Sequence, residues 1–349
     1  MRRRWLRLAR IAIAAGGLAV LAALGASFVY PGLAGPGRGR PVVLVIPRGA
    51  GPSTVGRAAR NAGLVRSGRL FAWYLRLAGA TPRLRAGRHR LRDDMTPREI
   101  LAHISRAAPG AAVRVTIPEG QDLFDVARTL DEVGVVHAEH FLAAARDREL
   151  LARLSIPGPS VEGYLFPDTY ELRAGVSGPG AERLVARMVA NFYRRTAGTL
   201  AGLEPEARQR VVVLASIVER EARAAVERPR IAAVFQNRMV AVDFTPHVLQ
   251  ADPTVAYGCR VDPSLPSCDG FGGRIGRRQL QDAANPYNTY LREGLPPGPI
   301  CNPGLPSLAA ARHPIETEDL YFVARGDGTH AFAKTLDEHN RNVARYRRR

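Results

Sequence analysis

Two glutamates lie two residues apart in a segment that is predicted to be helical. After Pro205 the sequence reads PEARQRVVVLASIVEREARAAVERP, with no further glycine or proline before Pro229. At about 100° per residue, Glu221 lies about 20° from Leu214 on the apolar side of this helix, whereas Glu219 points away from it. A carboxyl group among apolar side chains loses hydration, and its pKa rises toward the range that a general acid needs near neutral pH. Glu221 is therefore the candidate acid/base.

The same periodicity assigns the rest of this helix to two faces. The predicted apolar stripe consists of Val211, Leu214, Ile217, Val218, Ala222 and Ala225, and the opposite face of Ser216, Glu219, Arg220 and Arg223. Periodicity alone leaves an alternative open, in which Glu221 is a structural glutamate paired with an arginine such as Arg228 or Arg238.

The histidines and cysteines offer no second catalytic chemistry. His330 and His339 accompany no nucleophile motif and no metal-binding spacing, so we expect them to be hydrogen-bonding residues of a wall, and we expect neither a metal nor a cofactor. Cys259 and Cys268 flank a Pro-rich loop that a disulfide could close in an oxidising compartment, and the pairing stays open. Cys301 is left over as a third thiol.

The start of the chain predicts a membrane anchor. Residues 1–10, MRRRWLRLAR, carry five arginines, and residues 11–30 carry no charge, which is long enough to span a bilayer core of roughly 30 Å. The arginines predict a cytoplasmic N-terminus and an extracytoplasmic remainder. A cleaved signal peptide is the competing interpretation, but the apolar run is long and its cleavage site poor. Residues 31–41, rich in Pro and Gly, predict a linker that spaces a domain from the membrane.

The formal net charge is +18, and Lys334 is the single lysine. A solvated basic surface accounts for most of this charge, and attraction to anionic lipid or an anionic wall polymer is the functional alternative. The predicted topology places the basic bulk outside the cytoplasm, which excludes nucleic acid as a partner.

A repeat follows the linker. IPRGAGPSTVGRAARNAGLV from Ile46 aligns without a gap to IPEGQDLFDVARTLDEVGVV from Ile117, at an offset of 71 residues. Each copy predicts a short alternating strand, a glycine turn and an amphipathic helix. We expect two small α/β modules in tandem over residues 42–150, which either bind glycan or act as spacers.

Several ordered blocks downstream resemble one known family. EGYLFPDTYEL, LASIVEREA, VFQNR, LQADPTVAYG, NPYNTY, GLPPGPICNPG, SLAAARHP, LYFVA and HAFAKTLDEHN occur in the order found in the MltG (YceG-like) endolytic murein transglycosylases. The resemblance covers nearly the whole chain. It implies an α+β protein with a single N-terminal transmembrane helix, tandem LysM-like modules and a mainly helical catalytic domain over residues 151–349.

The resemblance also implies an activity. The family cuts the β-1,4 bond between MurNAc and GlcNAc in peptidoglycan and leaves 1,6-anhydroMurNAc ends, and its essential glutamate is the second of a Glu-x-Glu, which matches Glu221. The residue after it is commonly Thr or Ser but here is Ala222, so a hydroxyl hydrogen bond to the acid is missing or comes from elsewhere. A non-catalytic glycan-binding anchor and a muramidase that uses water are the alternatives.

Residues in the later blocks are candidates to bind the glycan, by chemistry and resemblance together. They are Gln250, Asp252 and Tyr257 in LQADPTVAYG, and Asn288, Thr289 and Tyr290 in NPYNTY. For each of them a structural role in a loop is an equal alternative. Glu162 and Asp168 are candidates for a second acidic group in the cleft, and Glu162 is also a candidate contact to substrate. Gly294 to Gly304 is a candidate for a rigid cleft wall, with Cys301 and Asn302 packing within it. We expect a single-pass protein of the inner (cytoplasmic) membrane, with peptidoglycan strands and glycan-polymerising synthases as partners.

Overall fold

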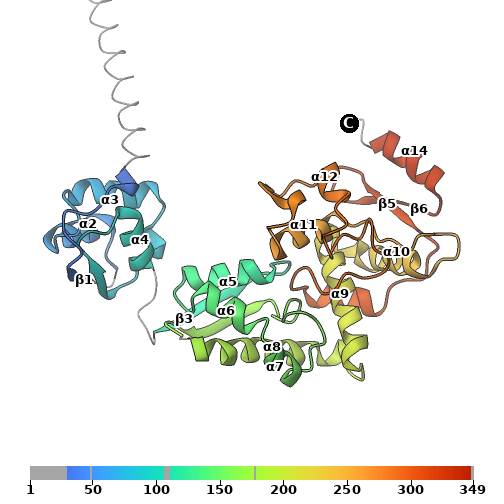
Figure 1. The fold of residues 1–349 in the computed structure, drawn as a ribbon, viewed down its shortest axis with the longest axis horizontal. Helices are drawn as coiled ribbons and strands as arrows, with labels where there is room; N and C mark the ends of the chain where they lie inside the picture. The colour runs from blue at the N-terminus through green and yellow to red at the C-terminus, as the bar shows by residue number, and fades with distance from the viewer. Residues whose placement is uncertain (1–29, 48, 106–110, 177, 347–349) are drawn as a thin grey trace, which may run out of the picture. The chain divides into compact units, whose positions relative to one another are not determined.

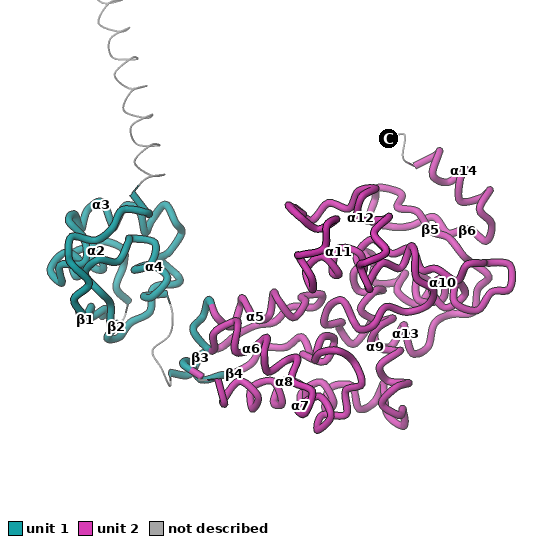
Figure 2. The backbone as a smooth tube through the Cα atoms, in the orientation of Figure 1, with its two compact units in different colours: residues 1–113, 132–135, 172–175 teal, residues 114–131, 136–171, 176–349 magenta. Residues whose placement is uncertain are grey.

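The computed structural model describes residues 30–47, 49–105, 111–176 and 178–346, which divide into two compact units (Figures 1 and 2). The fold is a mainly helical α+β arrangement, and the described strands form three two-stranded sheets. The predicted membrane span lies outside the described residues except for its last residue, Tyr30. Within the described ranges, no helix is both long and apolar enough to cross a bilayer.

The first unit is built on an antiparallel pair of strands covered by helices. Strand β1 (Pro41–Ile46) pairs antiparallel with β2 (Gly87–Arg92), and alternate residues of β1 point into the core. Between the strands lie α2 (Pro52–Asn61), α3 (Gly68–Leu77) and a 3-10 turn, η2 (Thr81–Arg83), and α4 (Pro97–Ser105) follows β2. The core centres on Leu44, Val55, Leu64, Phe71, Leu75, Leu91, Ile100 and Ile104.

The segment before β1, which the sequence predicts as a linker, is hydrogen-bonded to the first unit. After η1 (Tyr30–Gly32), the backbone N–H groups of Gly35 and Gly37 donate to the carbonyls of Asp94 and Asp93. The Asp93 carboxylate also accepts 2.8 Å hydrogen bonds from two later N–H groups of this segment. Composition predicts a linker here, and its N–H groups have distant acceptors on Asp93 and Asp94 that no local pattern reveals.

The repeat recurs in the structure. Strand β3 (Ala112–Ile117) and helix α5 (Leu123–Glu132) begin and end 71 residues after β1 and α2. Helices α6 (Ala138–Ala144) and α7 (Arg148–Arg153) follow, and β3 pairs with β4 (Asp168–Arg173). The pairing strand thus lies beyond residue 150, where the sequence predicts the module to end.

The second unit continues with helices and one short hairpin. Its remaining elements are α8 (Gly178–Leu200), α9 (Pro205–Glu221), η3 (Ala225–Glu227), α10 (Arg228–Val240), α11 (Asp252–Val261), η4 (Pro266–Cys268), α12 (Arg277–Leu280), α13 (Leu305–Arg312), β5 (Tyr321–Ala324), β6 (His330–Ala333) and α14 (Leu336–Tyr346). Strands β5 and β6 pair antiparallel, and α13 packs against α9 and α10.

Helix α9 is the centre of this unit and departs from the two-faced helix predicted from periodicity. Residues 212–218 are all buried, including Ser216, whose hydroxyl donates to the Val213 carbonyl and accepts from the Ile300 N–H at 3.0 Å. The helix also ends at Glu221, because Ala222 is extended (ψ 111°). A helix surrounded by protein on all sides has no polar face for periodicity to detect.

Candidate active site

Glu221 is the last residue of α9 and is only partly exposed. No hydrogen bond or ion pair to its carboxyl group occurs among the residues that the structure describes. Burial, and after it the charge of Asp252, raises its pKa to about 7, while the charges of Arg238 and Arg220 act in the opposite sense. A carboxyl group with this pKa carries a proton part of the time near neutral pH, as a general acid requires.

Asp252 and Tyr290 form a pair beside this carboxyl group. Asp252 begins α11 and is exposed, and its Oδ1 accepts a 2.7 Å hydrogen bond from the Tyr290 hydroxyl. Burial, followed by this hydrogen bond, raises the pKa of Tyr290 well above its usual value, and the charge of Glu221 contributes to the rise. The structure therefore brings three of the predicted site residues together, from α9, α11 and the loop after α12.

The loop that carries Gln250 is hydrogen-bonded to the loop that carries Tyr290. The backbone N–H of Gln250 donates to the Thr289 carbonyl at 2.9 Å, and that of Ala251 donates to the Thr289 hydroxyl. Gln250 has a left-handed backbone (φ 54°) and an exposed side chain. Such strain in a residue other than glycine is typical of functional loops, and Gln250 keeps its place as a candidate contact to substrate.

Arg238 is the cation with the larger effect on the pKa of Glu221. It lies on α10, where Nε donates to the Leu320 carbonyl at 2.7 Å and Nη1 donates to the Leu249 carbonyl. Its guanidinium lies over the rings of Phe244 and Tyr321. Burial lowers the pKa of this arginine. The sequence suggests Arg238 only as an alternative partner of Glu221. Its helical spacing from the buried residues Ile231, Val234 and Phe235 nevertheless places it on the inner face of α10.

Glu219, the other glutamate of this pair, forms a salt bridge. Its carboxylate lies 3.6 Å from Arg228 and accepts a 3.1 Å hydrogen bond from the Gly304 N–H. Both side chains are largely buried. Because Arg228 pairs with Glu219, it is not the structural partner of Glu221.

Glu162, a predicted contact to substrate, is buried inside the second unit. It is 1% exposed and accepts hydrogen bonds from the Leu123 N–H at 2.7 Å, the Tyr257 hydroxyl at 2.8 Å and the Asn302 amide at 3.0 Å. Burial, and after it the charge of Asp122, raises its pKa to about 8. A carboxylate with these partners joins α5, α11 and the loop before α13, and has no surface left for a glycan.

Tyr257 and Asn288 are also internal. Tyr257 is buried against the rings of Phe124 and Tyr287, so it has no free face for a sugar. The Asn288 amide donates to three carbonyls in residues 279–282, and its oxygen accepts from the Tyr290 N–H. Asn288 thus shapes the loop that presents Tyr290. A polar residue in a loop looks the same in sequence whether it binds substrate or its own backbone.

Several other predicted residues have structural partners. Asp168 pairs with Arg195 at 2.7 Å, and His330 Nδ1 lies 2.7 Å from the Glu227 carboxylate. His339 stacks on Tyr321. Among the described residues, no group of three or more acidic, His or Cys side chains is placed to hold a metal ion.

The cysteines, and Asn302 in the predicted cleft wall, also have structural roles. Cys259 and Cys268 form a disulfide, which closes the alternative left open by the sequence, and Cys301 is a buried free thiol. Asn302 is fully buried, and its side-chain oxygen accepts from the Leu165 N–H while its amide donates to the Gln121 carbonyl. The predicted packing role of Cys301 and Asn302 is confirmed.

A family model described as the YceG-like family matches residues 44–345, nearly the whole described chain. The chain belongs to the YceG-like family. The resemblance noted in the sequence is therefore confirmed, and the match includes the helices that carry Glu221, Arg238 and Asp252.

Relatives of this YceG-like protein have a named activity. The endolytic murein transglycosylase of Bacillus subtilis (strain 168) is 29% identical over 317 residues, which cover 86% of this chain and 83% of that protein. The endolytic murein transglycosylase of Streptococcus pneumoniae serotype 2 is 25% identical and matches over 87% of this chain and 58% of its own length. The crystal structure of a yceG-like protein from Listeria monocytogenes is 28% identical, with a TM-score of 0.55, and covers 86% of this chain and 98% of that one.

Proposed function

We propose that this protein is an endolytic murein transglycosylase, an enzyme that cuts peptidoglycan glycan strands internally. The observation that carries the proposal is Glu221, a carboxyl group with a pKa of about 7 and no protein hydrogen bond among the described residues. It occupies the position that the family resemblance assigns to the essential glutamate. The names of the relatives supply the substrate class.

One carboxyl group serves both halves of the proposed reaction. Protonated Glu221 gives its proton to the glycosidic oxygen as the bond between MurNAc C1 and that oxygen breaks, and the substrate's acetamido oxygen stabilises the positive C1 centre. The Glu221 carboxylate then takes the proton of the C6 hydroxyl, whose oxygen bonds to C1 and closes the 1,6-anhydro ring. The acid is regenerated, and no water enters the product.

The neighbouring groups prepare Glu221 for this cycle. The negative charge of Asp252 favours the protonated form of Glu221, and Arg238 stabilises the carboxylate that remains after proton transfer. Exposed Gln250 and the Asp252–Tyr290 pair are placed to contact sugar hydroxyls or the acetamido group. Each of these groups is held by backbone contacts that fix its position.

A hydrolytic muramidase is the second candidate, and Asp252 is the observation that favours it. Hydrolysis needs a second carboxylate that activates water, and Asp252 is an exposed acidic residue whose charge acts on Glu221. The two reactions leave different ends, because an anhydro end is lighter than a hydrolysed end by one water.

The test is digestion of purified peptidoglycan by the fragment that begins at Tyr30, with the products read by mass spectrometry. We expect anhydroMurNAc ends from the wild type and a loss of about 10²–10⁴-fold in rate for Glu221→Gln. Glu219→Gln is the matched control and should keep the chemistry. Full activity of Glu221→Gln would refute the assignment, and hydrolysed ends would favour the muramidase.

The placement of the enzyme is part of the same proposal. Residues 11–30 form a single-pass anchor in the inner (cytoplasmic) membrane, with the N-terminus in the cytoplasm and the catalytic part outside. The repeated modules are LysM-like, and glycan-polymerising synthases are the partners whose nascent strands the enzyme cuts. Support comes from the apolar run, the arginine cluster and the repeat. Protease accessibility of each terminus in intact spheroplasts tests the orientation.

A further inference from the structure

The excess positive charge of this protein is concentrated near its N-terminus. Residues 30–105 contain fourteen arginines and three acidic residues, whereas residues 106–349 contain thirty-one basic and twenty-nine acidic residues. A codon bias toward arginine would act on the whole chain and would leave the ratio of basic to acidic residues similar in both parts. The first unit is therefore strongly cationic, and the part that carries Glu221 is nearly neutral.

Helix α3 of this unit has two apolar faces. Phe71 and Leu75 are completely buried in the core. Leu70, Trp73 and Leu77 lie on the opposite side of the helix, and Trp73 and Leu77 are 38% and 58% exposed. Arg69 and Arg76, both exposed, flank this second face. An exposed aromatic and aliphatic stripe edged by arginines is typical of helices that lie in a membrane interface.

The first unit begins where the predicted membrane span ends. The ring of Tyr30 packs edge-on against Tyr74 of α3, with ring centroids 6.0 Å apart. The residues after Tyr30 are hydrogen-bonded to the unit instead of forming a spacer. With the anchor proposed above, α3 therefore lies in the unit that directly follows the membrane span.

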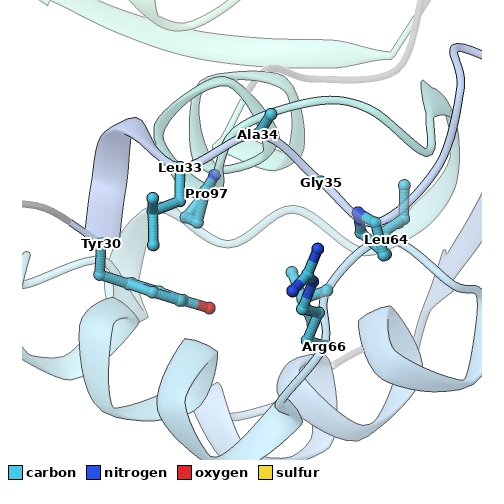
Figure 3. A pocket seen from close by; sticks show the side chains of 9 residues that line it. Tyr30, Leu33, Ala34, Gly35, Leu64, Arg66 and Pro97 are labelled. Carbon is cyan, nitrogen blue, oxygen red and sulfur yellow. The ribbon is translucent and has the colours of Figure 1, made fainter.

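A pocket of about 190 Å³ lies at the same place (Figure 3). The Tyr30 hydroxyl and the Arg66 guanidinium lie on facing sides of it, and Leu33 and Pro97 contribute apolar walls. The Tyr30 hydroxyl is buried and has no hydrogen-bond partner among the described residues. A cation and an uncommitted hydroxyl donor between apolar walls suit a phosphodiester attached to hydrocarbon.

We propose that the first unit binds the anionic phospholipid surface, with the α3 stripe in the interface and a headgroup phosphate between Arg66 and Tyr30. The inference rests on the membrane anchor of the proposed function. Anionic lipid fits better than an anionic wall polymer or a glycan strand, because a water-soluble polymer leaves the exposed leucines of α3 without a partner. The unit is thereby held at the bilayer surface.

The two tryptophans of the chain, Trp5 and Trp73, make a direct test possible. The full-length Trp5→Phe protein is reconstituted into vesicles of phosphatidylcholine alone or with about 30% phosphatidylglycerol, with a nitroxide quencher at headgroup depth. We expect quenching of Trp73 to be about twofold or more stronger in the anionic vesicles and to weaken in high salt. Equal quenching in both vesicles would overturn the proposal.

Charge-reversal variants separate this surface from the anchor and from the enzyme. Arg66→Glu with Arg69→Glu should remove the dependence on phosphatidylglycerol, and Tyr30→Phe should weaken it, while Arg183→Glu, an exposed arginine of α8, should leave it unchanged. Unchanged quenching in the double variant would overturn the proposal. It would also be overturned if quenching were lost only when peptidoglycan fragments are added, because that result would assign the surface to glycan. Flotation of every variant with the vesicles shows whether the anchor still inserts, and peptidoglycan digestion shows whether the enzyme is still active. Failure of the lipid-binding proposal is therefore distinguishable from failure of the proposed function.

Discussion

Glu221 and Glu162 are both withdrawn from water, but only one of them has protein donors. Glu162 accepts hydrogen bonds from three different parts of the second unit, whereas Glu221 accepts none among the described residues. The pKa of Glu221 therefore depends on burial and on neighbouring charges, and its lone pairs are available to a substrate. The sequence identifies both carboxyl groups as candidates, and only the contacts of each residue distinguish a catalyst from a structural glutamate.

Asp252→Asn should lower the pKa of Glu221, because it removes the negative charge that disfavours ionisation of that carboxyl group. Glycan cleavage needs protonated Glu221, so the rate should fall as pH rises through the pKa of about 7 in the wild type. In Asp252→Asn this alkaline fall should begin at lower pH, as measured by initial rates of peptidoglycan digestion from pH 5 to 9.

Tyr290→Phe is the control for that experiment. It removes the 2.7 Å hydrogen bond to Asp252 but leaves the charge of Asp252 in place. The alkaline fall should therefore stay near its wild-type pH even if the maximal rate drops. A shift of the same size in both variants would show that geometry, and not the charge of Asp252, sets the pKa of Glu221.

The approach of α2 and α3 depends on two glycines. A Cβ on Gly56 would lie 2.2 Å from the Gly68 carbonyl oxygen, and a Cβ on Gly68 would lie 2.4 Å from that of Gly56. Alanine normally stabilises a helix interior relative to glycine by about 1 kcal/mol. In Gly56→Ala we expect the clash to dominate and to lower the free energy of unfolding by about 1–3 kcal/mol, as measured by urea denaturation of the fragment from Tyr30.

Gly198 in α8 gives the matched control for this substitution. A Cβ at Gly198 would meet no atom within 4 Å, so Gly198→Ala should raise the free energy of unfolding by about 0.5–1 kcal/mol. Stabilisation by both substitutions would mean that α2 and α3 separate at little cost.

Local patterns in the sequence predict the elements of this fold that are two-faced. The alternating residues of β1 and β3 and the amphipathic α2 and α5 recur at the predicted offset of 71 because each has one buried side. The middle of helix α9, residues 212–218, is buried on all sides, so periodicity finds Glu221 but misplaces Ser216 on an exposed face. The buried position of Ser216 depends on Ile300 and Cys301, more than 80 residues away, which no local pattern contains.

The stability of the whole protein should depend on the protonation of its buried carboxyl groups. Burial raises the pKa of Glu162 to about 8 and that of Glu221 to about 7, from an ordinary value of 4.5. Between pH 4.5 and 7 or 8, the folded protein holds protons that the unfolded chain has lost. Stability should therefore be greatest below about pH 4.5 with respect to these two groups and fall as pH rises through that window.

Thermal denaturation of the fragment from Tyr30 between pH 5 and 9 measures this dependence. Glu221→Gln carries a neutral amide at every pH, so its melting temperature relative to the wild type should increase from pH 5 to pH 9, by several degrees in total. Glu162→Gln should show the same trend, offset downward at all pH values because the amide cannot accept all the hydrogen bonds that the carboxyl group accepts. A pH-independent difference between Glu221→Gln and the wild type would mean that Glu221 ionises in the fold as readily as in the unfolded chain. The same result would remove the physical basis for Glu221 as the acid, because a carboxyl group ionised at neutral pH has no proton to give to the glycosidic oxygen.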